Sequence, residues 1–240
     1  MMKIINKRGG TKAHHQDNVV YTINPYNGCY HQCIYCYSTQ SKMWTARSKK
    51  WGLENTSKAK AKKDIIERFK TDMEYLSNQN LPTSEKVIQI GNMADCYQPL
   101  EKDLKITREL LEILTNYQEW EVHVITKSDL ILRDIDLLKK IPKAIAEITI
   151  TTLTHDKVFE PNAPPTTRRF EIIKELSKNN IYVKVVLMPI LNDNTYNFTD
   201  VNKITQIAKQ NGAKDILPLP LNKAYKELSL QDLVKKYNIK

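Results

Sequence analysis

The sequence has little glycine, few cysteines and no long apolar run, and each shortage excludes a class of protein. Six glycines among 240 residues exclude a collagen-like repeat and a glycine-rich linker. No stretch reaches the roughly 18 apolar residues that a membrane-spanning helix needs. The basic start MMKIINKRGG is not followed by the apolar core of a secretory signal. We therefore expect a soluble cytoplasmic protein that has no membrane partner.

Acidic residues are also in the minority, with 27 Asp and Glu against 37 Lys and Arg, and the formal net charge is +10. The hydrophobic share of 41% and the charged share of 27% are typical of a globular chain rather than a disordered one. Residues 42–63 hold eight basic residues and one acid, with Trp44 and Trp51 among them. This mixture suits a phosphate backbone and stacked bases, although a lysine-rich solvated face is the alternative.

Short runs rich in Val, Ile and Thr alternate with longer helical patterns along the chain. Such alternation predicts a parallel sheet with helical crossovers. Six units fall short of the eight in a full barrel, so we predict an α/β fold with an incomplete barrel, and an open doubly wound sheet is the alternative. The predicted strands are Val19–Ile23, Lys86–Ile90, Glu121–Ile125, Ile145–Thr151, Ile181–Met188 and Lys214–Leu219. The predicted helices are Lys58–Leu76, Leu104–Leu114, Ile131–Lys139, Thr167–Ser177, Asp200–Lys209 and Leu228–Tyr237.

No linker divides the chain into separate units. We expect residues 1–18 to form an N-terminal tail and residues 19–240 to form a single domain that includes a short C-terminal helix. In either predicted architecture, functional residues collect at the carboxyl ends of the strands.

Three of the four cysteines form a C-x3-C-x2-C set, Cys29, Cys33 and Cys36, in the segment NPYNGCYHQCIYCYS. In a reducing compartment such residues are metal ligands or reactive thiols rather than disulfides. A compact thiolate set suits zinc or an iron–sulfur cluster. Three ligands on a four-iron cluster leave one iron open for a substrate or cofactor. The alternative is a structural zinc site whose fourth ligand is Cys96 or His31.

The triplet, with Tyr35 before its last cysteine, resembles the cluster loop of radical SAM enzymes. The segments ADCYQPLE, VITKSDLILRDIDLL, FEPNAPPTTRR and VKVVLMPILND resemble, in this order, the spore photoproduct lyase-like branch of that superfamily. The resemblance covers roughly residues 19–220 and implies a partial (β/α)6 barrel of parallel strands with a cluster at their C-terminal ends. It also implies that Cys29, Cys33 and Cys36 hold a [4Fe–4S] cluster whose open iron binds S-adenosylmethionine.

The resemblance further implies which residues bind S-adenosylmethionine. The sequence GNMAD replaces the Gly-Gly-Glu-like motif of many relatives, so Asn92 or Asp95 would accept from the methionine ammonium. Lys127 in ITKSD would meet the carboxylate. The other candidates are Tyr35 near the adenine, Thr152 as a hydroxyl donor, and either Arg168 or Arg169 beside the cofactor or an anionic substrate.

Three candidate catalytic residues follow from the same resemblance. Spore photoproduct lyase uses a cysteine as hydrogen donor to a thymine radical, with tyrosines proposed as a relay. Cys96 follows the second predicted strand, Lys86–Ile90, and Tyr35 and Tyr37 flank Cys36. A free cysteine is also often a small buried apolar residue, so packing is the alternative role for Cys96.

The implied activity is that of a radical SAM enzyme with a lyase- or isomerase-like reaction on a nucleobase in DNA or a nucleotide. It implies an external one-electron donor of flavodoxin or ferredoxin type. One alternative is radical modification of a small metabolite or peptide, and another is a non-catalytic, zinc-containing module that binds nucleic acid. The lyase has a C-terminal extension that helps to grip DNA, whereas only about one helix follows the last predicted strand here. This difference argues against photoproduct repair itself.

Overall fold

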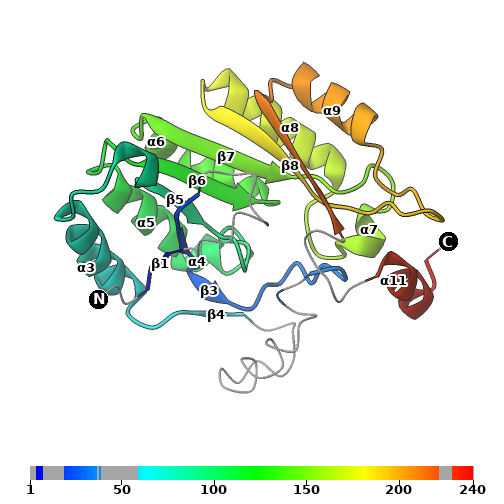
Figure 1. The fold of residues 1–240 in the computed structure, drawn as a ribbon, viewed down its shortest axis with the longest axis horizontal. Coiled ribbons are helices and arrows are strands. Elements are labelled where there is room, and N and C mark those ends of the chain that lie inside the picture. The colour runs from blue at the N-terminus through cyan, green and yellow to red at the C-terminus, as the bar shows by residue number, and fades with distance from the viewer. Residues whose placement is uncertain (1–3, 8–18, 37, 39–58, 222–228, 240) are drawn as a thin grey trace.

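A computed structural model describes residues 4–7, 19–36, 38, 59–221 and 229–239, and a seven-stranded sheet forms its centre. Six strands are parallel and adjacent in chain order (Figure 1). They are β2 (Tyr21–Ile23), β5 (Val87–Ile90), β6 (Glu121–Thr126), β7 (Lys143–Thr149), β8 (Tyr182–Ile190) and β9 (Asp215–Pro220). The short strand β1 (Asn6–Lys7) is antiparallel to β2 at one edge. The predicted α/β fold with a partial barrel is confirmed.

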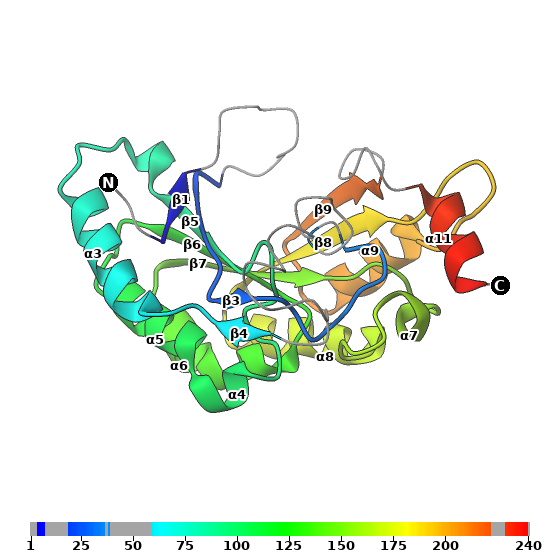
Figure 2. The ribbon, with the colours of Figure 1, turned by 90° about the horizontal axis from the view of Figure 1, so that it is seen from below.

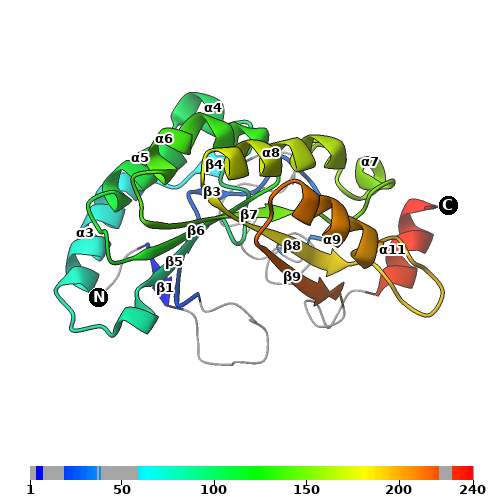
Figure 3. The ribbon, with the colours of Figure 1, turned by 90° about the horizontal axis from the view of Figure 1, so that it is seen from above.

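Helices cover the outer side of this sheet, as Figure 3 shows. In α5 (Ile106–Leu114), the buried residues Ile106, Leu110 and Leu114 recur every four positions and form the stripe that packs on the core. The other helices on this side are α3 (Ile65–Ser77), α6 (Ile135–Leu138), α8 (Thr166–Lys178) and α9 (Val201–Gln210). Among the described residues, no helix has the length and apolarity to cross a membrane.

Side chains on the inner face of the sheet are polar at its centre. Val122 and Val124 belong to the main core, and side chains alternate along a strand, so His123 faces the other way. Its neighbours on that inner face are Gln89 of β5 and Glu147 of β7. The two nitrogens of the His123 ring lie 2.7 Å from Glu147 and 2.7 Å from Glu121.

Three predicted helices differ from the structure at their ends. Residues 60–61 are not helical but form strand β4 (Lys60–Ala61), which pairs with β3 (Tyr26–Asn27). The segment KAKAKKD has no apolar stripe, and Asp64 has a left-handed φ of 52°, so α3 begins at Ile65.

A second left-handed residue, Lys105 with φ 53°, divides the next predicted helix into α4 (Glu101–Leu104) and α5. Leu104 therefore lies outside the apolar stripe and is 44% exposed. The predicted helix Ile131–Lys139 begins with the 3-10 helix η2 (Asp129–Asp134), which α6 continues. A further 3-10 helix, η1 (Thr83–Glu85), precedes β5.

Residues 4–7 lie in the segment predicted to be an N-terminal tail, but they join the sheet through β1. Ile4 and Ile5 are buried in the main core, and both of their amides donate to Asp72 of α3. Burial of two isoleucines and pairing of two amides give these residues a defined position.

A second, smaller apolar cluster lies at the C-terminal ends of the strands, apart from the main core. The last helix, α11 (Leu230–Tyr237), lies beside α7 (Asp156–Phe159) in Figures 1 and 2. The cluster combines residues of both helices with the cysteine segment: Cys33, Ile34, Tyr35, Phe159, Leu191, Leu221, Leu230, Leu233, Val234 and Ile239. The C-terminal helix therefore covers the segment that carries the cysteines.

Candidate metal and cofactor site

Residues 28–36, here called the cysteine loop, lie over the carboxyl ends of the central strands. The blue segment after β3 follows this path toward α7 in Figures 1 and 2. Tyr30 N donates to Gln98 Oε1 at 3.1 Å, and Gln98 Nε2 donates to Gly28 O at 3.2 Å. Farther along, Ile34 N donates to Phe159 O at 3.0 Å. The loop is thus fastened to the segments that follow β5 and β7.

None of the three cysteines of this loop is in a disulfide, and their side chains are largely shielded from water. Cys33 is 9% exposed, and Cys29 and Cys36 are half-buried. Burial raises the pKa of Cys29 to about 12 and raises that of Cys33 as well, so both thiols are protonated without a metal. Cation binding would displace these protons.

The described part of the chain has no group of three or more His, Cys, Asp and Glu side chains placed to hold a single metal ion. A structural zinc site needs four ligands that meet at one ion. In a four-iron cluster each thiolate binds a different iron, so the sulfurs need not meet at one point. Three cysteines on one loop, none of them in a disulfide, therefore fit a four-iron cluster that keeps one iron open.

Asp95 connects the cysteine loop to the ends of β5 and β6. Its Oδ1 accepts from Thr126 Oγ1 at 2.6 Å and from Tyr97 N at 2.9 Å. Its Oδ2 accepts from Lys127 N at 2.8 Å and lies 3.2 Å from His31 Nδ1. Burial alone would raise the pKa of Asp95, but His31 and these hydrogen bonds hold it far below its usual range. Asp95 is therefore a charged anchor with four partners.

A buried group of charges lies on the other side of the cysteine loop and centres on Glu160. The Tyr35 hydroxyl donates to Glu160 Oε1, and Thr151 Oγ1 donates to the same atom at 3.1 Å. Lys127 Nζ lies 3.8 Å from Glu160 Oε1, and Arg169 forms an ion pair with Glu160 Oε2. Lys127 Nζ also lies 6.0 Å from the centre of the Tyr35 ring.

Two cations share one carboxylate here, which leaves the group one positive charge in excess. Burial alone would raise the pKa of Glu160, but Arg169 and Lys127 hold it below its ordinary value. Within the described residues, the buried Arg169 Nη2 has no hydrogen-bond partner. A net cationic, buried group with an unused donor suits the anionic part of a ligand, such as a carboxylate.

The structure separates the two arginine candidates. Arg168 lies at the surface, where it pairs with Asp129 at 3.0 Å and with Glu171 at 2.8 Å. Arg169 is fully buried beside Glu160. Successive residues of a helix point about 100° apart, so only one of the pair can face inward. A cofactor contact from Arg168 stays a prediction, whereas Arg169 is the arginine that lies in the site.

Cys96 lies below the site rather than in it. Its side chain has no exposed surface, and its Sγ lies 3.6 Å from Ile125 O and 3.8 Å from Ile90 O. A Cβ on Gly91 would come within 2.9 Å of this sulfur, so only glycine allows the close packing. Burial raises the pKa of the thiol well above its usual value. The hydrogen-donor role of Cys96 stays a prediction, and it requires a path from this enclosed position to a substrate.

The remaining sequence candidates take different positions. Asn92 is half-buried on the segment after β5, and Asn24 Nδ2 donates to its Oδ1 at 3.2 Å. Thr152 is buried after β7, where its hydroxyl oxygen accepts from His155 N at 3.4 Å. Tyr37 lies outside the described residues.

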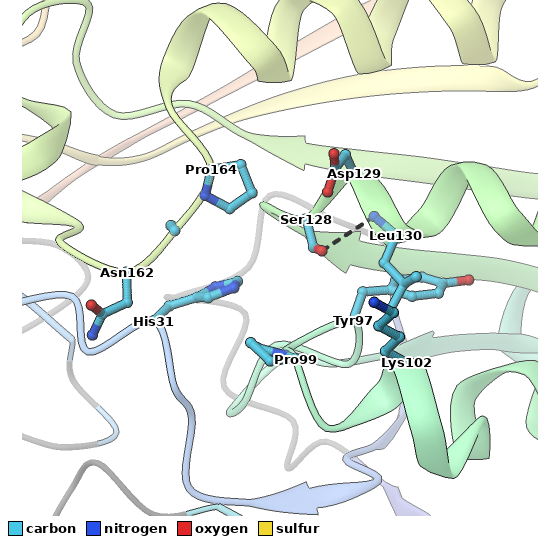
Figure 4. A pocket seen from close by; sticks show the side chains of 10 residues that line it. His31, Tyr97, Pro99, Lys102, Ser128, Asp129, Leu130, Asn162 and Pro164 are labelled. Atoms are coloured by element: carbon cyan, nitrogen blue, oxygen red, sulfur yellow. Dashed lines mark hydrogen bonds between the residues drawn. The ribbon is translucent and has the colours of Figure 1, made fainter.

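A pocket of about 440 Å³ opens on the outer side of the cysteine loop. Figure 4 shows the His31 ring reaching into it between Asn162 and Ser128, with Tyr97 and Lys102 on the opposite side. The pocket therefore gives solvent access to His31, which lies between Cys29 and Cys33 in the cysteine loop.

Glu160 and His31 are the site residues that sequence reasoning did not assign to S-adenosylmethionine binding or catalysis. Glu160 belongs to the segment FEPNAPPTTRR, whose resemblance to the lyase-like branch concerns the segment as a whole. A glutamate before a proline carries no local sign that it will be buried among cations. Its role depends on Tyr35, which is 125 positions away.

The sequence matches a family model described as the radical SAM superfamily over residues 23–201. An uncharacterized protein of Methanocaldococcus jannaschii is 32% identical over 175 residues, which are 72% of this chain and 61% of that protein. An uncharacterized protein of Acidianus two-tailed virus is 26% identical over 189 residues, or 70% of this chain and 54% of that protein. The chain thus spans less than two thirds of either relative.

Solved structures with the same fold include two enzymes with bound S-adenosylmethionine. A spore photoproduct lyase variant, which also holds a dinucleoside spore photoproduct, has a TM-score of 0.67 and 13% identity over 95% of this chain and 76% of its own. SuiB of Streptococcus suis has a TM-score of 0.58 and 12% identity over 90% of this chain and 42% of its own. At these identities the likeness concerns the fold alone.

Proposed function

Because the chain belongs to the radical SAM superfamily, we propose that Cys29, Cys33 and Cys36 hold a [4Fe–4S] cluster whose open iron binds S-adenosylmethionine. When bound and reduced by one electron, this pair supplies a 5′-deoxyadenosyl radical that abstracts hydrogen from a substrate. One observation carries the proposal. Three cysteines, none of them in a disulfide, lie on one loop at the carboxyl ends of the parallel strands, next to a buried group with excess positive charge.

The chain's own residues bind and orient the cofactor. Lys127, whose side chain is 15% exposed, and the buried Arg169 attract a carboxylate into an enclosed site where charge-assisted hydrogen bonds are strong. Asn92 or Asp95, which both lie on the segment after β5, would accept from the methionine ammonium. Tyr35 and Thr152 contribute a ring and a hydroxyl close to these groups. The cover formed by α11 shields the part of the loop that carries Cys33 and Tyr35 from water.

We propose a nucleobase in DNA or a nucleotide as the substrate, changed in a lyase- or isomerase-like reaction. The fold is shared with a lyase variant that holds a dinucleoside photoproduct, and the net charge of +10 favours phosphate. Part of the basic stretch that supports this assignment, residues 42–58, lies outside the described residues. A peptide substrate is the competing possibility, since SuiB in complex with its precursor peptide SuiA also has this fold, with a TM-score of 0.56.

An anaerobic assay tests the cofactor assignment. The protein is loaded with iron and sulfide, mixed with S-adenosylmethionine and a strong reductant, and examined for 5′-deoxyadenosine. We expect this product from the wild type and none from Cys33→Ala. Binding of zinc in place of a cluster would contradict the proposal.

The salt dependence of nucleic-acid binding tests the substrate class. Binding to phosphates releases counterions, so affinity for single- and double-stranded DNA should fall steeply and linearly on a log–log plot against salt. An affinity for DNA that does not change with salt concentration, or a higher affinity for peptides, would favour the peptide alternative.

The proposal includes an external one-electron donor. A reduced flavodoxin- or ferredoxin-type protein should replace the chemical reductant in the 5′-deoxyadenosine assay. Failure of both protein types would contradict this part of the proposal.

A further inference from the structure

Glu160 makes contacts with four separate parts of the chain. It lies at the C-terminal end of α7 and is 1% exposed. Its carboxylate meets Tyr35 of the cysteine loop, Thr151 after β7, Lys127 after β6 and Arg169 of α8. No other residue of the site joins the cysteine loop to both buried cations through one side chain in the described structure.

We infer that Glu160 is a positioning residue that fixes the cysteine loop through the Tyr35 hydroxyl and holds Lys127 and Arg169 where the cofactor carboxylate binds. The part that concerns Lys127 and Arg169, here called the cation half, rests on the proposed function. The part that concerns the cysteine loop, here called the loop half, can be tested on the protein without a cluster.

The loop half of the inference depends on two adjacent attachments. Tyr35 lies between Cys33 and Cys36, is 3% exposed and directs its hydroxyl to Glu160 and to Thr151, the latter at 3.1 Å. The preceding amide, Ile34 N, donates to Phe159 O at 3.0 Å. Phe159, the last residue of α7, and Glu160, which follows it, thus hold consecutive residues of the loop. Loss of the side-chain attachment removes one of the two adjacent bonds that hold the loop beside Cys33.

The cation half depends on how differently the two cations are held. Arg169 is fixed by Glu160, by Pro164 O at 2.9 Å and by Thr149 O at 3.3 Å. Lys127 Nζ is farther from Glu160, at 3.8 Å. A ligand carboxylate can therefore recruit Lys127 while Arg169 continues to neutralise Glu160. Without the carboxylate of Glu160, two buried cations would repel each other with no counter-ion.

Glu147 provides a matched control, because it is a buried carboxylate outside the cysteine loop. Glu147 is also 1% exposed and accepts from Gln89, contacts His123 and lies 3.3 Å from Lys184. It lies on the inner face of the sheet and has no contact with the cysteine loop among its hydrogen bonds and ion pairs in the described structure. Glu147→Gln therefore controls for the loss of a buried charge as such.

The first experiment uses the protein without a cluster. The rate at which iodoacetamide alkylates Cys33 is measured by peptide mass mapping in the wild type, Glu160→Ala, Glu160→Gln, Tyr35→Phe and Glu147→Gln. We expect alkylation to become about tenfold faster in Glu160→Ala and in Tyr35→Phe, since each removes a hydrogen bond to a charged group. Glu160→Gln can still accept from Tyr35 and should react like the wild type, as should Glu147→Gln.

The second experiment measures binding of S-adenosylmethionine and of its decarboxylated form to the cluster-loaded proteins. Glu160→Gln should change the preference for the carboxylate form about tenfold, because Lys127 and Arg169 lose the carboxylate that neutralises and positions them. Tyr35→Phe should retain the preference, and its reduced cluster should give an altered electron paramagnetic resonance signal. The two variants thus separate the two halves.

Several results would overturn the inference. An unchanged rate of Cys33 alkylation in both Glu160→Ala and Tyr35→Phe would contradict the loop half. An unchanged preference of Glu160→Gln for S-adenosylmethionine over its decarboxylated form would contradict the cation half. Equal effects from Glu147→Gln reduce Glu160 to a structural role. If Glu160→Ala does not fold, Tyr35→Phe and Glu160→Gln decide alone. A wild type that takes up no cluster would contradict both the proposed function and the cation half. The alkylation experiment, which uses the protein without a cluster, would still test the loop half.

Discussion

Cys33 and Cys96 are both buried cysteines, but their different neighbours suit them to different roles. Cys33 belongs to the small apolar cluster around the cysteine loop, whereas Cys96 belongs to the main core and contacts carbonyl oxygens at the strand ends. A metal ligand needs neighbours that can move apart to admit the metal. A core thiol contributes packing and a weak hydrogen bond.

The Cys96→Ala variant should therefore retain the cleavage of S-adenosylmethionine. Removal of the sulfur leaves the cysteine loop and the buried charges untouched, so 5′-deoxyadenosine should form at the wild-type rate. If Cys96 donates hydrogen, the substrate-derived product will change while this rate does not. Chromatography of both products makes the comparison, and loss of 5′-deoxyadenosine would contradict the expectation.

The charge of His123 makes stability depend on pH near neutrality. Burial alone would lower its pKa, but the hydrogen bonds to Glu147 and Glu121 raise it above 6.5. The protonated ring donates from both nitrogens to these carboxylates. Because the folded pKa lies above the unfolded value, the stabilisation is fully present below about pH 6.5 and is lost as the pH rises through the folded pKa.

We expect His123→Gln to remove this part of the pH dependence. The free energy of unfolding of the wild type should fall as the pH rises above about 6.5, and that of the variant should fall less. Urea unfolding across this pH range provides the measurement. His155→Gln, which changes a half-buried histidine next to Phe198, serves as the control. Equal pH slopes for the wild type and His123→Gln would show that His123 does not carry the dependence.

Among the elements, α11 has the clearest separate role. Leu230, Leu233 and Val234 pack on the small cluster that includes Cys33 and Tyr35, and none of them belongs to the main core. Ser229 begins the helix by accepting from Asp232 N at 3.0 Å. We therefore expect that the helix detaches without unfolding the sheet and that its attachment limits the access of water and oxygen to the cysteine loop.

Leu233→Asp should weaken the packing of α11 by about 2 kcal/mol, the value of one buried leucine. We expect faster bleaching of the reconstituted protein in air, with little change in the unfolding midpoint of the cluster-free form. Absorbance of the cluster over time and a thermal scan provide the two measurements. Lys235→Ala, on the exposed side of the same helix, is the control. Equal bleaching of Leu233→Asp and the control would separate α11 from protection of the cluster.

On the scale of the whole molecule, the site is assembled from parts that lie far apart in the chain. The cysteine loop, the segments after β5, β6 and β7, and α8 each contribute at least one group, and α11 covers the loop. A ligand that bridges these parts binds only the folded chain. Binding is therefore coupled to global unfolding.

S-adenosylmethionine at about 100 times its Kd should raise the free energy of unfolding of the cluster-loaded protein by about 2.7 kcal/mol. Lys127→Met should reduce this gain at the same ligand concentration because it removes a cation from the carboxylate site. Thermal unfolding under anaerobic conditions measures the shift. Lys178→Met, at the exposed end of α8, should retain it. A wild type without any shift would contradict the assignment of the site.

Local sequence was sufficient for the six parallel strands, most of the helices and the cysteine triplet. Each of these depends on residues that are close together in the chain, such as the apolar stripe of α5 or the spacing of Cys29, Cys33 and Cys36. The family followed from the same short motifs and their order, and it is confirmed by the match over residues 23–201. The early start predicted for α3 failed where a lysine-rich stretch without an apolar stripe preceded the helix.

Only the tertiary structure decided how the site is arranged. Arg168 and Arg169 are identical neighbours, and the direction of α8 determines that Arg169 is the buried one. Asp95 acquires its partners from three segments, and Glu160 meets Tyr35 across 125 positions. No periodicity or spacing carries such information, because charge pairing in a low-dielectric interior depends on which segments the fold brings together.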